Sequence, residues 1–100
     1  MLIAILDFSV AATTRTAALA QQDGECDAVR AMSGNVAFRV YTSREDETRI
    51  AVVHEWDDEA SFAAYLASGS FARSSQALRP ILTGGPVSRR FHADLLETIT

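Results

Sequence analysis

Two side chains stand out as groups that could act on a bound organic molecule, Asp7 and Tyr65. Asp7 is the one charged residue in the apolar run Leu2 to Phe8, where it shares its alternation with Ile3 and Ile5. A carboxylate facing an apolar region is a stronger base, because burial disfavours its charged form, so Asp7 is a candidate general base. Tyr65 lies on an apolar helical face, and its hydroxyl can donate to a phenolate or carbonyl oxygen.

Each of these two residues also has a structural interpretation. Asp7 can lie at the rim of the sheet, where it caps the following helix or pairs with an arginine. Tyr65 can be an ordinary core residue, as aromatic side chains on apolar helical faces usually are.

The remaining reactive residue types are His54, His92, Trp56 and Cys26. His54 and Trp56 are two residues apart on a strand, so they face the same side. Trp56 is typical of a packing anchor, whereas His54 reaches either the ligand volume, a dimer seam or a structural hydrogen bond. His92 is interpreted in the same way, and Cys26 is expected to be a small core residue. The imidazoles and the thiol lack the spacing of metal ligands, so no metal site is expected.

The hydrophobic pattern predicts four strands and two helices. The predicted strands cover Leu2 to Phe8, Val36 to Tyr41, Ile50 to Trp56 and Val87 to Leu95. The first helix covers Ala12 to Met32, and the second begins after Asp57 and Asp58, is interrupted at Ser68 to Ser70 and resumes from Phe71 to Leu78. The order β-α-β-β-α-β predicts an α+β, ferredoxin-like domain over residues 1–100, with a four-stranded antiparallel sheet and two helices on one face.

The first strand is apolar at both alternations, which two helices on one face cannot cover. A second copy of the same chain is the simplest cover for the other face, so we expect a homodimer. The formal net charge is −4 and the nine basic residues are scattered arginines, which argues against nucleic-acid binding. No apolar run is long enough to cross a bilayer, and the expected location is the cytoplasm.

The stretch from Val52 to Phe71, VVHEWDDEASFAAYLASGSF, resembles the antibiotic biosynthesis monooxygenase family. The match consists of Glu55 and Trp56 at a strand end, an acidic helix cap, an apolar helix and a small-residue turn before a phenylalanine. The segment SGNVAFRVY, from Ser33 to Tyr41, resembles the turn and strand that precede it in the family. The resemblance implies a dimeric α+β barrel, in which two sheets face each other and each subunit holds a pocket between its sheet and its helices.

Enzymes of this family include oxygenases of polycyclic aromatic or quinol substrates that need no metal or flavin, and others that degrade heme. The heme-degrading branch uses an Asn, a Trp and an iron-ligating His at places that hold Asp7, Tyr65, and Ser74 or Ser75 here. The resemblance therefore implies a cofactor-independent monooxygenase acting on a phenolic, quinol or polyketide-like aromatic molecule.

Asp7 and Tyr65 are the expected catalytic groups of this reaction. The residues expected to contact the substrate are Ile3, Ile5, Phe38, His54, Trp56, Phe62 and Phe71. The alternative is a dimer without catalysis, which binds a small ligand or in which the same residues pack solid. A cavity with polar groups favours the first interpretation and a filled core the second. Lactone isomerisation on the same barrel plan rests on analogy alone.

Overall fold

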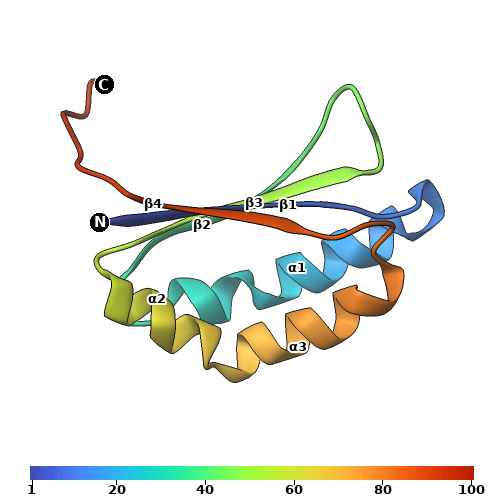
Figure 1. Cartoon of the computed structure of the whole chain (residues 1–100), viewed down its shortest axis with the longest axis horizontal. Helices are drawn as coiled ribbons and strands as arrows, with labels where there is room; N and C mark the ends of the chain where they lie inside the picture. Colours follow the sequence, from blue (N-terminus) through green and yellow to red (C-terminus); the bar gives the residue numbers. More distant parts are fainter.

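The computed structural model describes residues 1–100 and has the predicted order of elements. These are β1 (Leu2–Ser9), the 3-10 turn η1 (Ala12–Thr14), α1 (Arg15–Arg30), β2 (Asn35–Thr42), β3 (Arg49–Trp56), α2 (Glu59–Leu66), α3 (Gly69–Leu78), the 3-10 turn η2 (Arg79–Ile81) and β4 (Val87–His92). The strands form one antiparallel sheet in the order β2-β3-β1-β4, and all helices lie on one face of it (Figure 1). The ferredoxin-like α+β fold is therefore confirmed.

Three elements differ by more than one residue from their predicted extents. The first helix, α1, covers Arg15–Arg30 in place of Ala12 to Met32, and Ala12–Thr14 form the 3-10 turn η1. The second predicted helix is two helices, because the Ser68 hydroxyl accepts from the Phe71 backbone N–H at 3.2 Å and caps a new helix, α3. The last strand ends at His92 instead of Leu95, because its partner strand β1 begins at Leu2, which is paired with His92. None of the helices is both long and apolar enough to cross a membrane.

The hydrophobic core lies between the sheet and the helices. From β1 it takes the alternation that includes Leu2, Ala4 and Phe8, and from β3 it takes the alternation that ends at the fully buried Trp56. Cys26 of α1 belongs to this core, as expected. Burial of these apolar side chains is the main force that holds the three helices against the sheet.

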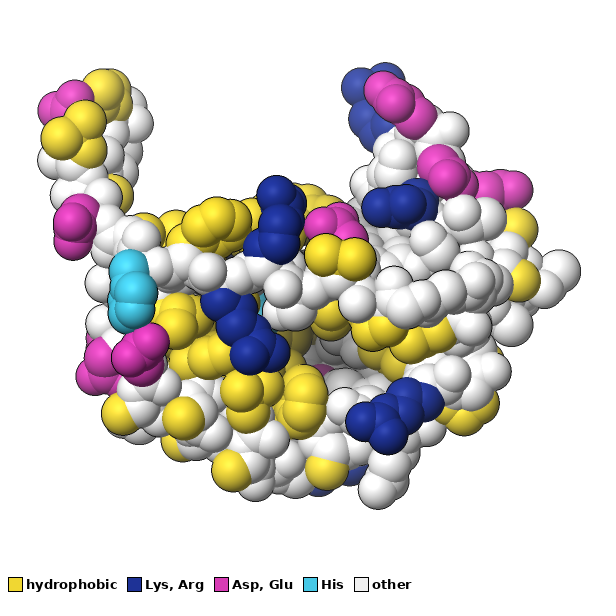
Figure 2. Space-filling view, viewed as in Figure 1, with side chains coloured by type: hydrophobic (Ala, Val, Ile, Leu, Met, Phe, Trp, Pro, Cys, Tyr) yellow, Lys and Arg dark blue, Asp and Glu magenta, His cyan; other side chains and the backbone are white.

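The opposite face of the sheet has no helix on it. Ile3, Ile5 and Asp7 point to this open face, and Ile5 is paired there with Val53 of β3 and Arg89 of β4. The loop between β2 and β3 and the C-terminal segment both rise on this side, away from the helices (Figure 1). Apolar side chains lie on the sheet between these two arms (Figure 2).

Gly34 fixes the junction from which α2 departs. It has a φ of +82°, and its carbonyl accepts from the Asp57 backbone N–H at 2.8 Å, which joins the α1–β2 turn to the end of β3. A side chain at this position would collide with the Cβ and Oγ atoms of Ser61 in the first turn of α2. The junction therefore accepts only glycine.

We expect Gly34→Ala to destabilise the protein by about 1–3 kcal/mol, because alanine disfavours positive φ and displaces the first turn of α2. Gly24→Ala is the matched control, since Gly24 lies within α1 with nothing within 4 Å of an added Cβ. It should stabilise the protein by about 0.5–1 kcal/mol. Urea unfolding measures the free energy of unfolding of both variants. Equal changes at the two positions would contradict this description of the junction.

Candidate functional site

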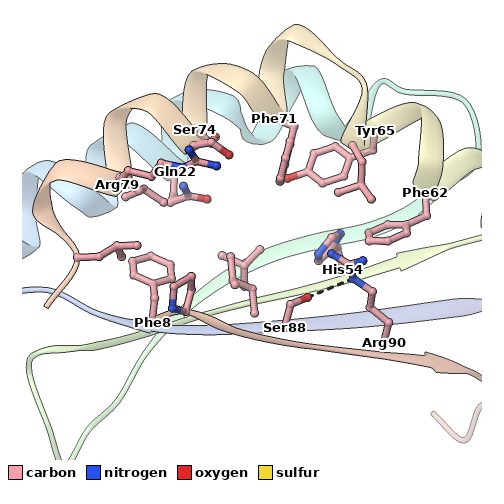
Figure 3. Close-up of a pocket in the computed structure, with 17 residues that line it drawn as sticks. Phe8, Gln22, His54, Phe62, Tyr65, Phe71, Ser74, Arg79, Ser88 and Arg90 are labelled. Carbon is pink, nitrogen blue, oxygen red and sulfur yellow. Dashed lines mark hydrogen bonds between the residues drawn. The ribbon is translucent and has the colours of Figure 1, made fainter. Parts of the chain in front are cut away.

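A cavity of about 260 Å³ lies between the sheet and the helices (Figure 3). Its apolar wall is formed by side chains from the sheet and from α2 and α3, among them Leu6, Phe8, Val52, Phe62, Leu66, Phe71 and Leu78. The space-filling view shows a hollow between the sheet and the helices (Figure 2). In another protein, an engineered apolar cavity of about 150 Å³ binds benzene. A substituted aromatic molecule therefore fits the larger volume of this cavity.

His54 of β3 is a buried member of the cavity wall. Its Nδ1 accepts a hydrogen bond of 2.9 Å from Nε1 of Trp56, which faces the same side of the strand. Burial, and secondly the positive charge of Arg90, lower the pKa of His54 to about 4. The imidazole is therefore neutral at pH 7, and because Nδ1 is an acceptor, its one proton is on Nε2.

The Nε2–H group of His54 has no hydrogen-bond partner in the protein and is not sealed from the cavity. It can donate to a ligand oxygen. It is not a general base or a metal ligand in this state, because either role requires a bare Nε2 and a proton on Nδ1. That would leave the buried Trp56 N–H facing another donor.

Tyr65 of α2 lies beside His54 and carries the second donor. Its ring stacks on Trp56 with the centroids 5.3 Å apart and meets the His54 ring edge-on at 5.4 Å. The hydroxyl has no protein partner and points into the cavity (Figure 3). Burial, and secondly the charge of Glu25, raise the pKa of Tyr65 to about 12, so the hydroxyl stays protonated and donates.

Buried polar side chains also line the other end of the cavity. Gln22 of α1 and Ser74 of α3 face each other there (Figure 3). Gln21 joins them: its Nε2 donates to Ser74 Oγ at 3.2 Å, and its Oε1 accepts from Gln22 Nε2 at 2.8 Å. Gln22 was not among the predicted site residues, although it falls on the helical stripe of Leu19 and Cys26, where an apolar residue is expected.

Arg79 and Arg90 are the charged residues of the cavity wall, and no carboxylate lines it. The Arg90 guanidinium lies over the Phe62 ring, 5.0 Å from its centroid, and its Nε donates to Ser88 Oγ at 3.3 Å. These contacts hold the guanidinium near the His54 end of the cavity (Figure 3). Neither arginine was among the predicted site residues: Arg90 is on β4 and Arg79 begins the 3-10 turn η2.

Four of the nine residues predicted for the site line this cavity: His54, Phe62, Tyr65 and Phe71. Phe38 and Trp56 lie behind the wall, where they pack against the rings of His54 and Tyr65.

The expectation that Ile3, Ile5 and Asp7 share the cavity with Tyr65 was wrong. The three residues do lie on one side of β1, but the helices cover the other side, which carries Leu6 and Phe8. The Asp7 carboxylate faces Arg89 on the open face, with Oδ2 3.9 Å from Nη2, which is the arginine pair of the structural interpretation.

The side chains of the cavity do not fit a heme iron. The place where the heme-degrading branch has its histidine holds Ser74 or Ser75, and both line the cavity. Nδ1 of His54 is committed to Trp56. No group of three or more His, Cys, Asp or Glu side chains is arranged to hold another metal.

Comparison with known proteins identifies the family. The family model for antibiotic biosynthesis monooxygenases matches residues 1–77. The chain belongs to the antibiotic biosynthesis monooxygenase family. No curated protein matches the sequence significantly.

Solved structures of this family share the whole fold at low sequence identity. A candidate antibiotic biosynthesis monooxygenase of Deinococcus radiodurans is 17% identical, with 100% of this chain and 99% of that one covered and a TM-score of 0.91. A candidate of Nitrosomonas europaea is 15% identical over 93% of this chain and 98% of that one, with a TM-score of 0.88. A protein of Mycobacterium tuberculosis is 17% identical over 98% of both chains, with a TM-score of 0.87. At these identities the likeness shows the fold alone.

The depressed pKa of His54 makes the stability of this family member depend on pH. Between pH 6.5 and about 4 the unfolded chain binds a proton that folded His54 does not. The free energy of unfolding should therefore fall by up to about 3 kcal/mol as the pH drops through this window. Urea unfolding at a series of pH values measures it.

His54→Gln should flatten this dependence, because the amide oxygen can still accept from Trp56 but does not titrate. His92→Gln is the control, since His92 is exposed. Equal slopes for the wild type and His54→Gln would contradict the assignment.

Proposed function

We propose that the protein is a monooxygenase that uses no metal or flavin and oxidises a phenolic, quinol or polyketide-like aromatic molecule in the cavity between sheet and helices. The family and the aromatic-lined volume support this proposal. The observation that carries it is the pair of neutral donors, His54 Nε2–H and Tyr65 O–H, which face the cavity without protein partners.

The reaction needs an electron-rich anion of the substrate. A phenol that has lost its proton can give electrons directly to dioxygen, and a phenol with a free para carbon is then oxidised to a para-quinone. One atom of dioxygen becomes the new ring oxygen, and the other leaves as water with the two hydrogens that the phenol has lost. Atoms and electrons balance without a further reductant.

The cavity would promote this reaction by stabilising the phenolate. Two neutral donors, His54 and Tyr65, and the Arg90 guanidinium line the end of the cavity proposed for its oxygen, and such groups favour the charged form. No carboxylate lines the cavity, so the proton passes to water and not to Asp7. The site thus lowers the pKa of the bound phenol in place of a general base.

The lack of a proton acceptor also favours a second candidate, a protein that binds an aromatic ligand without turnover. The two functions differ in one measurement: dioxygen uptake in the presence of a phenol that binds. Uptake with formation of a quinone supports the monooxygenase, whereas tight binding of the phenolate with no uptake supports the binding protein.

Tyr65→Phe should reduce turnover of a naphthol by about tenfold to a hundredfold, because it removes one donor to the developing oxyanion. The melting temperature should not fall, since the hydroxyl bonds to nothing in the protein. Dioxygen consumption and thermal unfolding measure the two effects.

Tyr41→Phe is the matched control for this loss, because Tyr41 is the other tyrosine of the chain and lies exposed on β2. Loss of turnover in Asp7→Asn, with Tyr65→Phe unaffected, would instead move the reaction to the open face of the sheet.

We also propose that two copies associate through their open sheet faces. Members of this family are usually dimers, and the face carries the apolar side chains Ile3, Ile5, Val53 and Phe91. The C-terminal segment beside it exposes Leu95 by 70% and Leu96 by 94%, a large apolar surface for a chain that stands alone. The two arms that rise beside the face suit a partner that sits between them (Figure 2).

Light scattering should give twice the chain mass of 10.8 kDa at micromolar concentration. Ile5→Glu should yield monomers, because it places a charge in the centre of the proposed interface. Ala64→Glu, on the exposed face of α2, is the control that should remain dimeric. A wild-type monomer would contradict this interface.

A further inference from the structure

The end of the cavity opposite His54 is polar, and the hydrogen bonds to Gln21 use only part of its donors. Gln22 and Ser74 are buried there at helical positions that face the core, and the Arg79 side chain lies beside them (Figure 3). The proposed oxygenation uses only the His54 and Tyr65 end. Gln21 pairs with Gln22 and Ser74 but not with Arg79, so a ligand group can complete the hydrogen bonding at this second polar end.

The hydrogen bonds at this end leave donors free. Ser74 Oγ already accepts from Gln21, so the proton of its own hydroxyl is available to another acceptor. Arg79 takes part in none of the ion pairs or side-chain hydrogen bonds of the chain. A free hydroxyl proton beside an uncommitted guanidinium suits a carboxylate.

The charge around the cavity favours the same kind of ligand. The chain carries a formal net charge of −4, yet its cavity is lined by two arginines and by no acidic residue. Both charged side chains in the cavity wall are therefore cations that attract an anion, whereas Glu25, whose charge raises the pKa of Tyr65, lies outside the wall. Arg79 and Arg90 lie at different ends (Figure 3), so one arginine can face the reacting oxygen and the other an acidic substituent.

We propose that the ligand is an aromatic acid, whose phenolic oxygen lies between His54 and Tyr65 and whose carboxylate is bound by Arg79 and Ser74 at the other end. This inference rests on the proposed function, because it takes the His54 end as the place of the reacting ring. It adds a class of substrate, a hydroxylated aromatic carboxylate, and names Arg79 as the residue that selects it.

The test compares a hydroxynaphthoate, with its hydroxyl and carboxyl groups at opposite ends of the ring system, with the hydroxynaphthamide of the same pattern. The two probes have nearly the same shape and differ by one charge. Calorimetric titration of the wild type at neutral pH should give an affinity about tenfold or more higher for the acid.

Variants of the cavity arginines and of Ser74 show which residue causes the preference for the acid over the amide. Arg79→Gln should reduce the ratio of the two affinities to about one, Ser74→Ala should reduce it in part, and Arg79→Lys should retain most of it. Arg44→Gln, in the exposed loop between β2 and β3, should leave the ratio unchanged. Arg90→Gln should also leave it unchanged, since Arg90 lies at the phenolate end.

Three results would overturn the carboxylate site: equal affinities for acid and amide, binding of neither probe, or a ratio lost in Arg90→Gln but kept in Arg79→Gln. Acid-selective binding that depends on Arg79, without dioxygen uptake for any bound phenol, would instead overturn the proposed oxygenation and leave the carboxylate site in place.

Discussion

The hydrogen bond from Trp56 Nε1 to His54 Nδ1 determines the chemistry available in the cavity. It places the one proton of a neutral imidazole on Nε2, the nitrogen left to the ligand. A protonated His54 would set two donors against each other inside the core, so the bond and the desolvation act in the same direction. The cavity therefore offers donors to an oxyanion in place of a base that removes a proton.

The rest of the fold keeps this pair in position. Alternation on β3 turns both residues toward the helices, and α2 brings Tyr65 onto the Trp56 ring. The close contact at Gly34 sets where α2 begins, and the Ser68 cap lets α3 start in a new direction, so that Phe71 meets Tyr65 edge-on at 5.4 Å. The stability of the fold and the geometry of the cavity thus depend on the same aromatic residues, Trp56, Tyr65 and Phe71.

Local patterns in the sequence were sufficient to predict the order of elements and the inward face of α2, since both follow from helical and strand periodicity. They could not show which side of β1 meets the helices, because Ile3 and Ile5 are as apolar as Leu2 and Leu6. For this reason Asp7 was wrongly predicted to lie in the cavity between the sheet and the helices. The hydrogen bond between Trp56 and His54 depends on side-chain rotamers, which a single sequence does not show. The positions of Arg79 and Arg90 in the cavity wall depend on residues that are distant in the sequence. Only Gln22, a polar residue on an apolar helical stripe, indicated in the sequence that the cavity has a second polar end.

Nitrogen-15 NMR of the histidine side chains, recorded across a pH titration, reports which nitrogen of His54 carries the proton. We expect His54 to have a bare Nδ1 and a protonated Nε2 at neutral pH, and to keep this pattern until the pH approaches its pKa of about 4. Trp56→Phe should release the tautomer preference, because it removes the donor to Nδ1. A proton on Nδ1 in the wild type at neutral pH, or an imidazolium there, would contradict the role of His54 as a neutral Nε2–H donor.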